Sequence, residues 1–261
     1  MCRRATGFYL SEAMTTLKAV AAGDSWLVHL PFHLGTGGGL ANALFGDIMG
    51  IPYTNLAHAG DSSEESMGTA MAAKLEAALP GADILLWSSG GDDFAGDEFE
   101  IFLDENDGRD ASLAVNMDRF QVALDVTMMD YARLVELRDR VAPNCLIACH
   151  GYDYPPASQM GNGFLTFGPW LQPGLIRRGW KDADDQSKAV RAALDALAKR
   201  LSDFAAVTPR VLFVNQLGAC KPEHWANELH LNSGGCAIHA RGLHYALLPR
   251  LDEIAFPSSP H

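Results

Sequence analysis

The sequence Ala22-Gly23-Asp24-Ser25-Trp26 follows a mostly apolar run, residues 17–22, in which only Lys18 is polar. An apolar run that ends at a glycine predicts a first β-strand followed by a tight turn. In an open α/β fold, a serine on such a turn presents its hydroxyl above the sheet edge where ligands bind. Ser25 is therefore a candidate nucleophile. The alternative is ordinary turn chemistry, since Gly, Asp and Ser all favour turns.

Three further polar turns follow along the chain, and the four together resemble the blocks of the SGNH (GDSL-type) hydrolase family. The three are Asn55-Leu56-Ala57-His58-Ala59-Gly60-Asp61, Ser88-Ser89-Gly90-Gly91-Asp92-Asp93 and Trp225-Ala226-Asn227-Glu228-Leu229-His230. In that family the blocks supply, in order, the serine, an oxyanion glycine, an oxyanion asparagine and the histidine. One bacterial branch of it is also similar in three segments: Gly-Asp-Ser-Trp, His150-Gly151-Tyr152-Asp153-Tyr154 and Asn227-Glu228-Leu229-His230.

The resemblance implies a serine ester hydrolase with a flavodoxin-like three-layer α/β fold. Its substrate would be an acyl or acetyl ester of a small molecule or sugar, and it would need neither a metal nor an organic cofactor. Ser25 would attack the carbonyl and His230 would act as the base, oriented by Asn227. The oxyanion hole would comprise the backbone N–H groups of Ser25 and Gly60 together with Asp92.

Two residues depart from the family pattern. Asn227 stands where the family has the orienting aspartate, so it can accept a hydrogen bond from the imidazole but cannot neutralise the imidazolium. Asp92 stands where the family has the oxyanion asparagine, and a carboxyl group donates a hydrogen bond only when it is protonated. These departures support a second hypothesis, a protein that keeps the fold and binds acyl or carbohydrate ligands without turnover.

Periodicity predicts five strands that alternate with helices, which is typical of a doubly wound parallel sheet. The expected strands are residues 16–22, 52–57, 84–87, 146–149 and 210–214. The expected helices are residues 40–49, 64–79, 112–141, 182–204 and 234–251. The glycine-rich turn at residues 35–39 lacks the P-loop lysine, so we interpret it as a flexible rim of the site.

Aromatic residues near the same sheet edge are candidates for substrate binding, namely Trp26, Tyr152 and Trp170. Trp170 belongs to a long Gly- and Pro-rich segment, residues 157–180, which we expect to be irregular and to act as a lid or binding loop or simply to pack over the edge. His150, at the end of the fourth strand, is a rival for the general base, although a structural role is the favoured interpretation.

Composition limits the class of protein. With 261 residues and 48% hydrophobic composition, the chain can bury one large core, so we expect one domain over residues 1–261. A formal charge of −12 argues against nucleic-acid binding, and no apolar run is long enough to span a membrane. The expected partner is a small-molecule ester. The absence of a convincing signal peptide and the five cysteines, an odd number, favour a reducing cytoplasmic setting.

Metal chemistry has little support in the sequence. Cys145 and Cys149 fall on one side of a predicted strand and are expected to be buried thiols, and no paired zinc motif is present. Residues 94–110 are acidic but lack the spacing of a calcium loop, so a solvated face is favoured. A metal-dependent phosphoesterase is the third and least favoured hypothesis.

Overall fold

A computed structural model describes residues 17–31, 33, 39–165 and 167–255. Five parallel strands form one sheet in the order β2-β1-β3-β4-β5. They are β1 (Ala19–Gly23), β2 (Tyr53–Asn55), β3 (Ile84–Ser88), β4 (Leu146–His150) and β5 (Val211–Val214). Each strand lies inside its predicted range or extends it by one residue; Thr16, the predicted first residue, lies outside the described part. β1, β3 and β4 are buried along their whole length, which explains their continuous apolar sequences.

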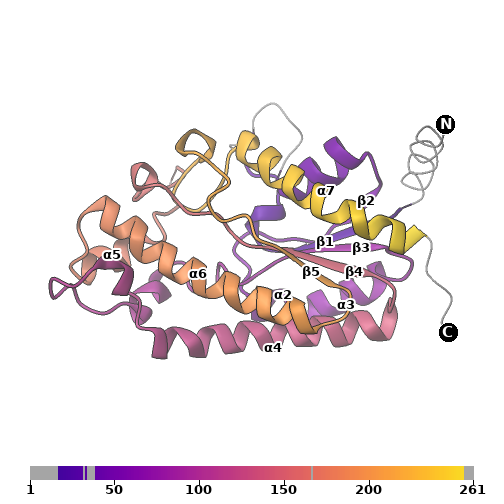
Figure 1. The fold of residues 1–261 in the computed structure, drawn as a ribbon, viewed down its shortest axis with the longest axis horizontal. Helices are drawn as coiled ribbons and strands as arrows, with labels where there is room; N and C mark the ends of the chain where they lie inside the picture. Colours follow the sequence, from indigo (N-terminus) through magenta and orange to yellow (C-terminus); the bar gives the residue numbers. More distant parts are fainter. Residues whose placement is uncertain (1–16, 32, 34–38, 166, 256–261) are drawn as a thin grey trace.

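Helices cover both faces of the sheet (Figure 1). The π-helix η2 (Asn42–Met49) and α7 (Ser233–Ala255) pack together on one face. The other face is covered by α3 (Thr69–Ala78), α4 (Met117–Val141) and α6 (Ala183–Val207). This is the predicted doubly wound arrangement, in which ligands bind beyond the carboxyl ends of the strands. None of the helices in the described part is long and apolar enough to cross a membrane.

The helix predicted over residues 64–79 is two helices, α2 (Ser63–Ser66) and α3. Ser62 and Glu65 form a capping box at the start of α2. The backbone is extended at Gly68, which precedes α3. Glycine has a low helix propensity, so the break comes where the helix is weakest.

The helix predicted from residue 112 begins later, at Met117, because the side chain of Asn116 caps it by accepting the N–H of Arg119 (3.1 Å). A separate 3₁₀ turn, η4 (Ala111–Leu113), precedes that cap.

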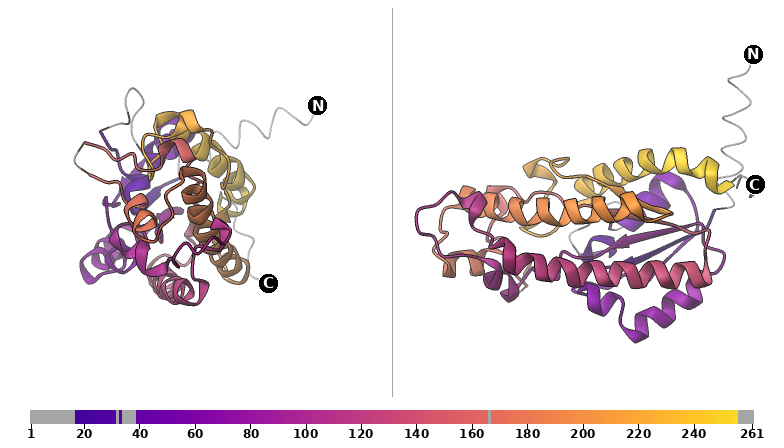
Figure 2. Two further views of the ribbon diagram at one scale, coloured as in Figure 1. Left: turned by 90° about the vertical axis from the view of Figure 1, so that its left-hand side faces the viewer. Right: turned by 60° about the horizontal axis from the view of Figure 1, so that its bottom comes forward.

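The helices α4 and α6 are much longer than the strands they cover. Each has 25 residues, or about 37 Å at 1.5 Å per residue, whereas a five-residue strand spans about 17 Å. Both helices therefore project beyond the sheet, where η4, η3 (Asp97–Phe102) and α5 (Gln172–Arg177) pack against them and one another (Figure 2). The segment 157–180 is only partly irregular, since it contains η5 (Ala157–Gln159) and α5.

At the opposite end of the sheet, Arg138 of α4 is a buried brace. Its side chain is 1% exposed. Its guanidinium donates to the carbonyl oxygens of Cys145 (2.8 Å), Arg210 (3.0 Å) and Pro209 (3.0 Å). These carbonyls belong to the turns that lead into β4 and β5, so one side chain satisfies buried backbone groups of two connections.

We expect Arg138→Met to destabilise the protein by about 3 kcal/mol, because three buried carbonyl groups lose a charged donor. For a domain of this size that corresponds to a fall in melting temperature of roughly 10 °C. Thermal unfolding followed by circular dichroism measures it. Arg140→Met on the same helix is the matched control, since Arg140 is exposed and pairs with Glu76 at the surface. Equal melting temperatures for both variants would contradict the role of Arg138.

Candidate active site

Ser25 begins a 3₁₀ turn, η1 (Ser25–Leu27), directly after β1. Gly23 has a φ of +125°, and a Cβ atom there would lie 1.8 Å from the carbonyl oxygen of Ser88, so only glycine fits. Asp24 caps the turn: its carboxylate accepts the N–H of Trp26 (3.0 Å) and the hydroxyl of Ser88 (2.7 Å). The turn predicted from the sequence is thereby held at the carboxyl edge of the sheet.

A chain of hydrogen bonds joins Ser25, His230 and Asn227. The Nε2 atom of His230 lies 2.9 Å from the Oγ atom of Ser25. The Nδ1 atom lies 3.0 Å from the Oδ1 atom of Asn227. The structure thus brings together three residues that are 205 and 3 positions apart in the sequence, in the arrangement that activates a serine hydroxyl.

The orientation of the Asn227 amide follows from its backbone partners. Its Oδ1 atom also accepts the N–H groups of Leu229 and His230, each at 2.9 Å. The reverse orientation would set an amide NH₂ group against two N–H donors. With the oxygen facing the ring, His230 carries its proton on Nδ1, and Nε2 is the acceptor for the Ser25 hydroxyl.

Burial keeps His230 neutral. The side chains of Ser25 and His230 are both buried. Burial, with a smaller effect from the nearby His33, lowers the pKa of His230 to about 4. At neutral pH the imidazole is therefore unprotonated at Nε2 and able to accept a proton.

Asp92 and Gly60 face the same cavity as Ser25 and His230. The Oδ2 atom of Asp92 is buried and has no hydrogen-bond partner among the residues that the structure describes. Burial, reinforced by the charges of Asp24 and Asp93, raises the pKa of Asp92 to about 8. At neutral pH Asp92 is mostly the neutral acid, the form that can donate a hydrogen bond.

The cavity has a volume of about 330 Å³ and mainly apolar walls. Its lining comprises Ser25, Leu30, Pro31, Ala59, Gly60, Asp92, Phe164, Phe167, Trp170, Leu229 and His230. Trp170 also packs edge-on against the imidazole of His230, with ring centroids 5.4 Å apart. The sequence carried no signal for Leu30 and Pro31, because apolar loop residues look alike whether they line a cavity or cover a core.

Solved structures share this fold. The chain is similar to a lipase from a goat rumen metagenome (TM-score 0.58, 14% identity, 90% of this chain and 100% of that one). It is similar to an extracellular lipase from Streptomyces rimosus (TM-score 0.55, 15% identity, 88% of this chain and 99% of that one). It is also similar to a carbohydrate esterase of family 3 from Talaromyces cellulolyticus (TM-score 0.54, 12% identity, 91% of this chain and 99% of that one). No family model and no curated protein matches the sequence. At these identities the likeness establishes the fold, so the predicted α/β class with the five-stranded parallel sheet of SGNH hydrolase structures is confirmed.

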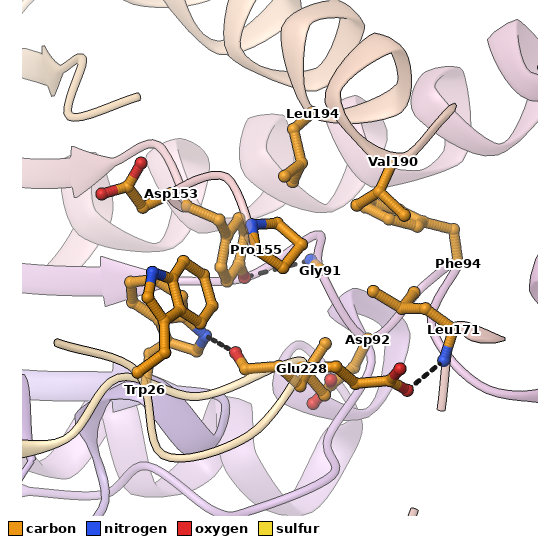
Figure 3. A pocket seen from close by; sticks show the side chains of 13 residues that line it. Trp26, Gly91, Asp92, Phe94, Asp153, Pro155, Leu171, Val190, Leu194 and Glu228 are labelled. Carbon is orange, nitrogen blue, oxygen red and sulfur yellow. Dashed lines mark hydrogen bonds between the residues drawn. The ribbon is translucent and has the colours of Figure 1, made fainter. Parts of the chain in front are cut away.

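Trp26 and Tyr152 are not brought into the cavity that Ser25 faces. They line a second, smaller cavity of about 30 Å³ (Figure 3), which has room for about one water molecule. The indole N–H of Trp26 donates to the carbonyl of Leu229 (3.1 Å). The hydroxyl of Tyr152 donates to Asp24 and accepts the N–H of Gly91 (3.0 Å). Both residues therefore support the turns that carry the site, and of the three predicted aromatic residues only Trp170 lines the larger cavity.

His150 is not the partner of Ser25 among the described hydrogen bonds. Its Nδ1 atom lies 3.1 Å from the carbonyl oxygen of Gly151, and its ring packs against Trp26, with centroids 5.6 Å apart. Burial lowers the pKa of His150 to about 4. The hydroxyl of Ser25 is bonded to His230 instead, which favours the structural interpretation of His150.

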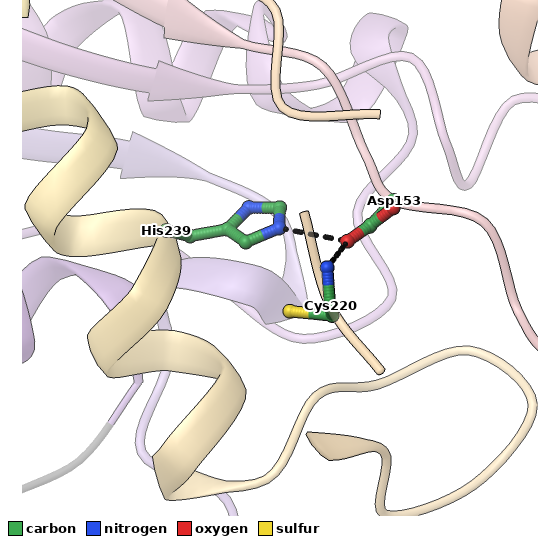
Figure 4. A group of neighbouring side chains, drawn as sticks. All are labelled: Asp153, Cys220 and His239. Atoms are coloured by element: carbon green, nitrogen blue, oxygen red, sulfur yellow. Dashed lines mark hydrogen bonds and ion pairs between the residues drawn. The ribbon is translucent and has the colours of Figure 1, made fainter. Parts of the chain in front are cut away.

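Asp153 and His239 are buried and Cys220 is half-buried, and the potential ligand atoms of the three lie within 4.8 Å of one another (Figure 4). The Asp153 carboxylate already accepts the N–H groups of Tyr154 (2.7 Å), Gly218 (2.5 Å) and Cys220 (2.7 Å). His239 Nε2 adds a contact of 3.3 Å. Because both oxygens are occupied, the group fits a hydrogen-bonded brace between the turns after β4 and β5 and helix α7 better than a metal site.

Two aspartates of the acidic segment are paired with arginine, and two cysteines are buried in the core. In the acidic segment, Asp104 and Asp107 pair with Arg109 at the surface. Burial raises the pKa of Cys145 and Cys149 to about 12, as expected of inert core thiols. Cys2 and residues 35–38 of the glycine-rich turn lie outside the described residues.

The hydrogen bond to Asn227 gives a testable prediction about the imidazole. We expect nitrogen NMR to show His230 as the neutral Nδ1–H tautomer at pH 7, titrating near pH 4. Asn227→Asp places a negative charge beside the ring and should raise the pKa of His230 by one unit or more. A His230 signal that titrates near pH 6.5 in the unmodified protein, or that is unmoved in Asn227→Asp, would refute this description of the site.

Proposed function

We propose that the protein is a serine ester hydrolase in which Ser25 is the nucleophile, His230 the general base and Asn227 the residue that orients it. The observation that carries this proposal is the hydrogen-bond chain from Asn227 through His230 to Ser25 at the mouth of an apolar cavity. The lipase and esterase neighbours add support at the level of the fold.

The chemistry proceeds in two balanced steps. The Ser25 hydroxyl gives its proton to Nε2 of His230 while Oγ forms a bond to the ester carbonyl carbon, and the resulting imidazolium then protonates the departing alcohol. The acyl group remains on Ser25. A water molecule next gives a proton to His230 while its oxygen bonds to the acyl carbon. The bond from that carbon to Oγ then breaks, His230 returns the proton to Oγ of Ser25, and the carboxylic acid is released.

Asn227 makes His230 a weaker base than an aspartate would, but it preserves the correct tautomer. In a serine protease, replacing the orienting Asp by Asn costs about 10⁴ in turnover, mainly through the wrong tautomer. Here two backbone N–H groups hold the amide oxygen toward the ring. Asn227 lacks the negative charge that would stabilise the imidazolium but keeps the tautomer, so we expect it to lower turnover by less than the factor of about 10⁴ seen in the protease.

Asp92 acts as the third oxyanion donor in its neutral form. A buried carboxylic acid that stays protonated at pH 7 can donate to a developing oxyanion, whereas its ionised form would repel it. The backbone N–H groups of Ser25 and Gly60 would supply the other two donors.

The cavity walls favour an apolar acyl group as the substrate's acid portion. Apart from Ser25, Gly60, Asp92 and His230, the lining residues that the structure describes are apolar. Each buried CH₂ group contributes about 0.8 kcal/mol of transfer free energy, so an acyl chain of several carbons gains more here than an acetyl group does.

The first test is hydrolysis of p-nitrophenyl acetate, butyrate and octanoate. We expect Ser25→Ala to abolish turnover above the background rate, and Ser158→Ala, at an exposed position, to leave it unchanged. Equal rates for the wild type and Ser25→Ala would eliminate Ser25 as the nucleophile. If neither variant nor wild type turned over but octanoate still bound, the alternative of a non-catalytic acyl-binding protein would stand, in keeping with its Asp92 and Asn227.

The pH dependence of kcat/KM should be bell-shaped, with limbs near pH 4 and pH 8. Below about 4, His230 is protonated and cannot accept the serine proton; above about 8, Asp92 ionises and repels the oxyanion. Asp92→Asn keeps a neutral donor at every pH. We therefore expect it to remove the alkaline limb and to raise activity at pH 9 by tenfold or more, with the acid limb unmoved. An alkaline limb that persists in Asp92→Asn must arise from another group.

A further inference from the structure

Glu228 lies between Asn227 and His230 in the sequence but serves a different part of the structure. Its side chain is fully buried. One carboxylate oxygen accepts the N–H of Leu171 (2.6 Å) and the N–H of Trp170. The other accepts the N–H of Gly161 (2.8 Å). Figure 3 shows the carboxylate directed at Leu171.

These partners lie at the two ends of one hairpin. Phe164 and Phe167 pair across its tip through two backbone hydrogen bonds of 2.7 and 2.9 Å. Gly161 precedes the tip, and Trp170 and Leu171 follow it. The backbone N–H of Glu228 also donates to the carbonyl of Asn162 (3.0 Å), so this residue holds the base of the hairpin with both its main chain and its side chain.

The hairpin forms one wall of the cavity. Phe164, Phe167 and Trp170 all line it, and Trp170 packs against the ring of His230. The position of these three aromatic side chains depends on where the base of the hairpin is held. Glu228 therefore connects the turn that carries the base to the surface that an acyl chain would contact.

The partners described for the carboxylate are backbone N–H groups. Burial raises the pKa of Glu228, whereas these main-chain donors favour its charged form, as donors at a helix N-terminus do for a capping carboxylate. Removing such an acceptor leaves several N–H groups without a partner, whereas a glutamine retains one acceptor oxygen but turns an NH₂ group toward an N–H donor.

We propose that Glu228 is a positioning residue that determines acyl-chain specificity, by clipping both ends of the hairpin around Phe164 and Phe167 to the catalytic turn. The proposal rests on the proposed esterase function for its effect on specificity. The hydrogen bonds between Glu228 and the base of the hairpin are a property of the structure, and their effect on the hairpin can be measured without turnover.

The test compares wild type, Glu228→Gln and the matched control Glu223→Gln, whose side chain is exposed in the same segment. Amide hydrogen exchange of the peptides that cover residues 161–171 reports the clip. The ratio of kcat/KM for p-nitrophenyl octanoate to that for p-nitrophenyl acetate measures how well the hairpin side of the cavity binds a long acyl chain. We expect exchange in Glu228→Gln to rise at least tenfold, and the octanoate-to-acetate ratio to fall at least tenfold, mainly through KM for octanoate. Glu223→Gln should match the wild type in both measurements.

Two outcomes would overturn the proposal. One is unchanged hairpin exchange in folded Glu228→Gln, and the other is an equal loss for acetate and octanoate, which a merely structural role would produce. An inert wild type would sink the proposed function alone, because exchange of the hairpin amides still decides whether Glu228 holds it. If Glu228→Gln unfolds, Glu228→Asp, which keeps the charge but shortens the reach, takes its place with the same expected results.

Discussion

The carboxylate of Asp24 holds the carboxyl edge of the sheet together. It accepts hydrogen bonds from its own turn, from Ser88 at the end of β3 and from Tyr152 in the turn after β4. The hydroxyl of Tyr152 in turn accepts the N–H of Gly91, the residue before Asp92. The turns after the three central strands are thus joined through one buried side chain, and both Ser25 and Asp92 are direct sequence neighbours of residues in that network.

The same network gives two buried aspartates, Asp24 and Asp92, different environments. Burial raises the pKa of both Asp24 and Asp92. Asp24 has three hydrogen-bond donors that stabilise its anion, whereas the buried oxygen of Asp92 has none among the described residues. These donors favour the charged form of Asp24, and the charge of Asp24 is one of the causes that raise the pKa of Asp92. The two carboxyl groups therefore differ in environment because they differ in hydrogen-bond donors.

The sheet and the placement of Ser25 could be predicted because they depend on local signals. Each strand is an apolar run that ends in a polar or glycine-containing turn, and parallel strands bring such turns to one edge. The sequence also contains local signals for the break between α2 and α3, namely Ser62, Glu65 and Gly68. The alanine-rich pattern that follows nevertheless predicts one continuous helix. At this position the capping box and the glycine, rather than the helical periodicity, determine where the helices begin and end.

The functions of Tyr152 and Glu228 could not be predicted, because they depend on contacts across the fold. Position alone placed Tyr152 near the site, but its hydroxyl turns toward Asp24 since its ring packs over Gly91, where a Cβ atom would lie 2.7 Å from the ring. Likewise, nothing local indicates that the Glu228 side chain meets amides at residues 161, 170 and 171. These partners are 57 to 67 positions away in the sequence, with the whole of α6 between.

The position of Glu228 also gives a physical reason for Asn227. An aspartate at position 227 would be a second carboxylate next to Glu228, and both positions are fully buried, so burial and like charge would disfavour its ionisation. An asparagine accepts the same three hydrogen bonds without that charge. The turn therefore places its buried carboxylate against the amides of residues 161, 170 and 171 rather than beside the imidazole of His230, which keeps its hydrogen bond to Asn227 without an adjacent charge.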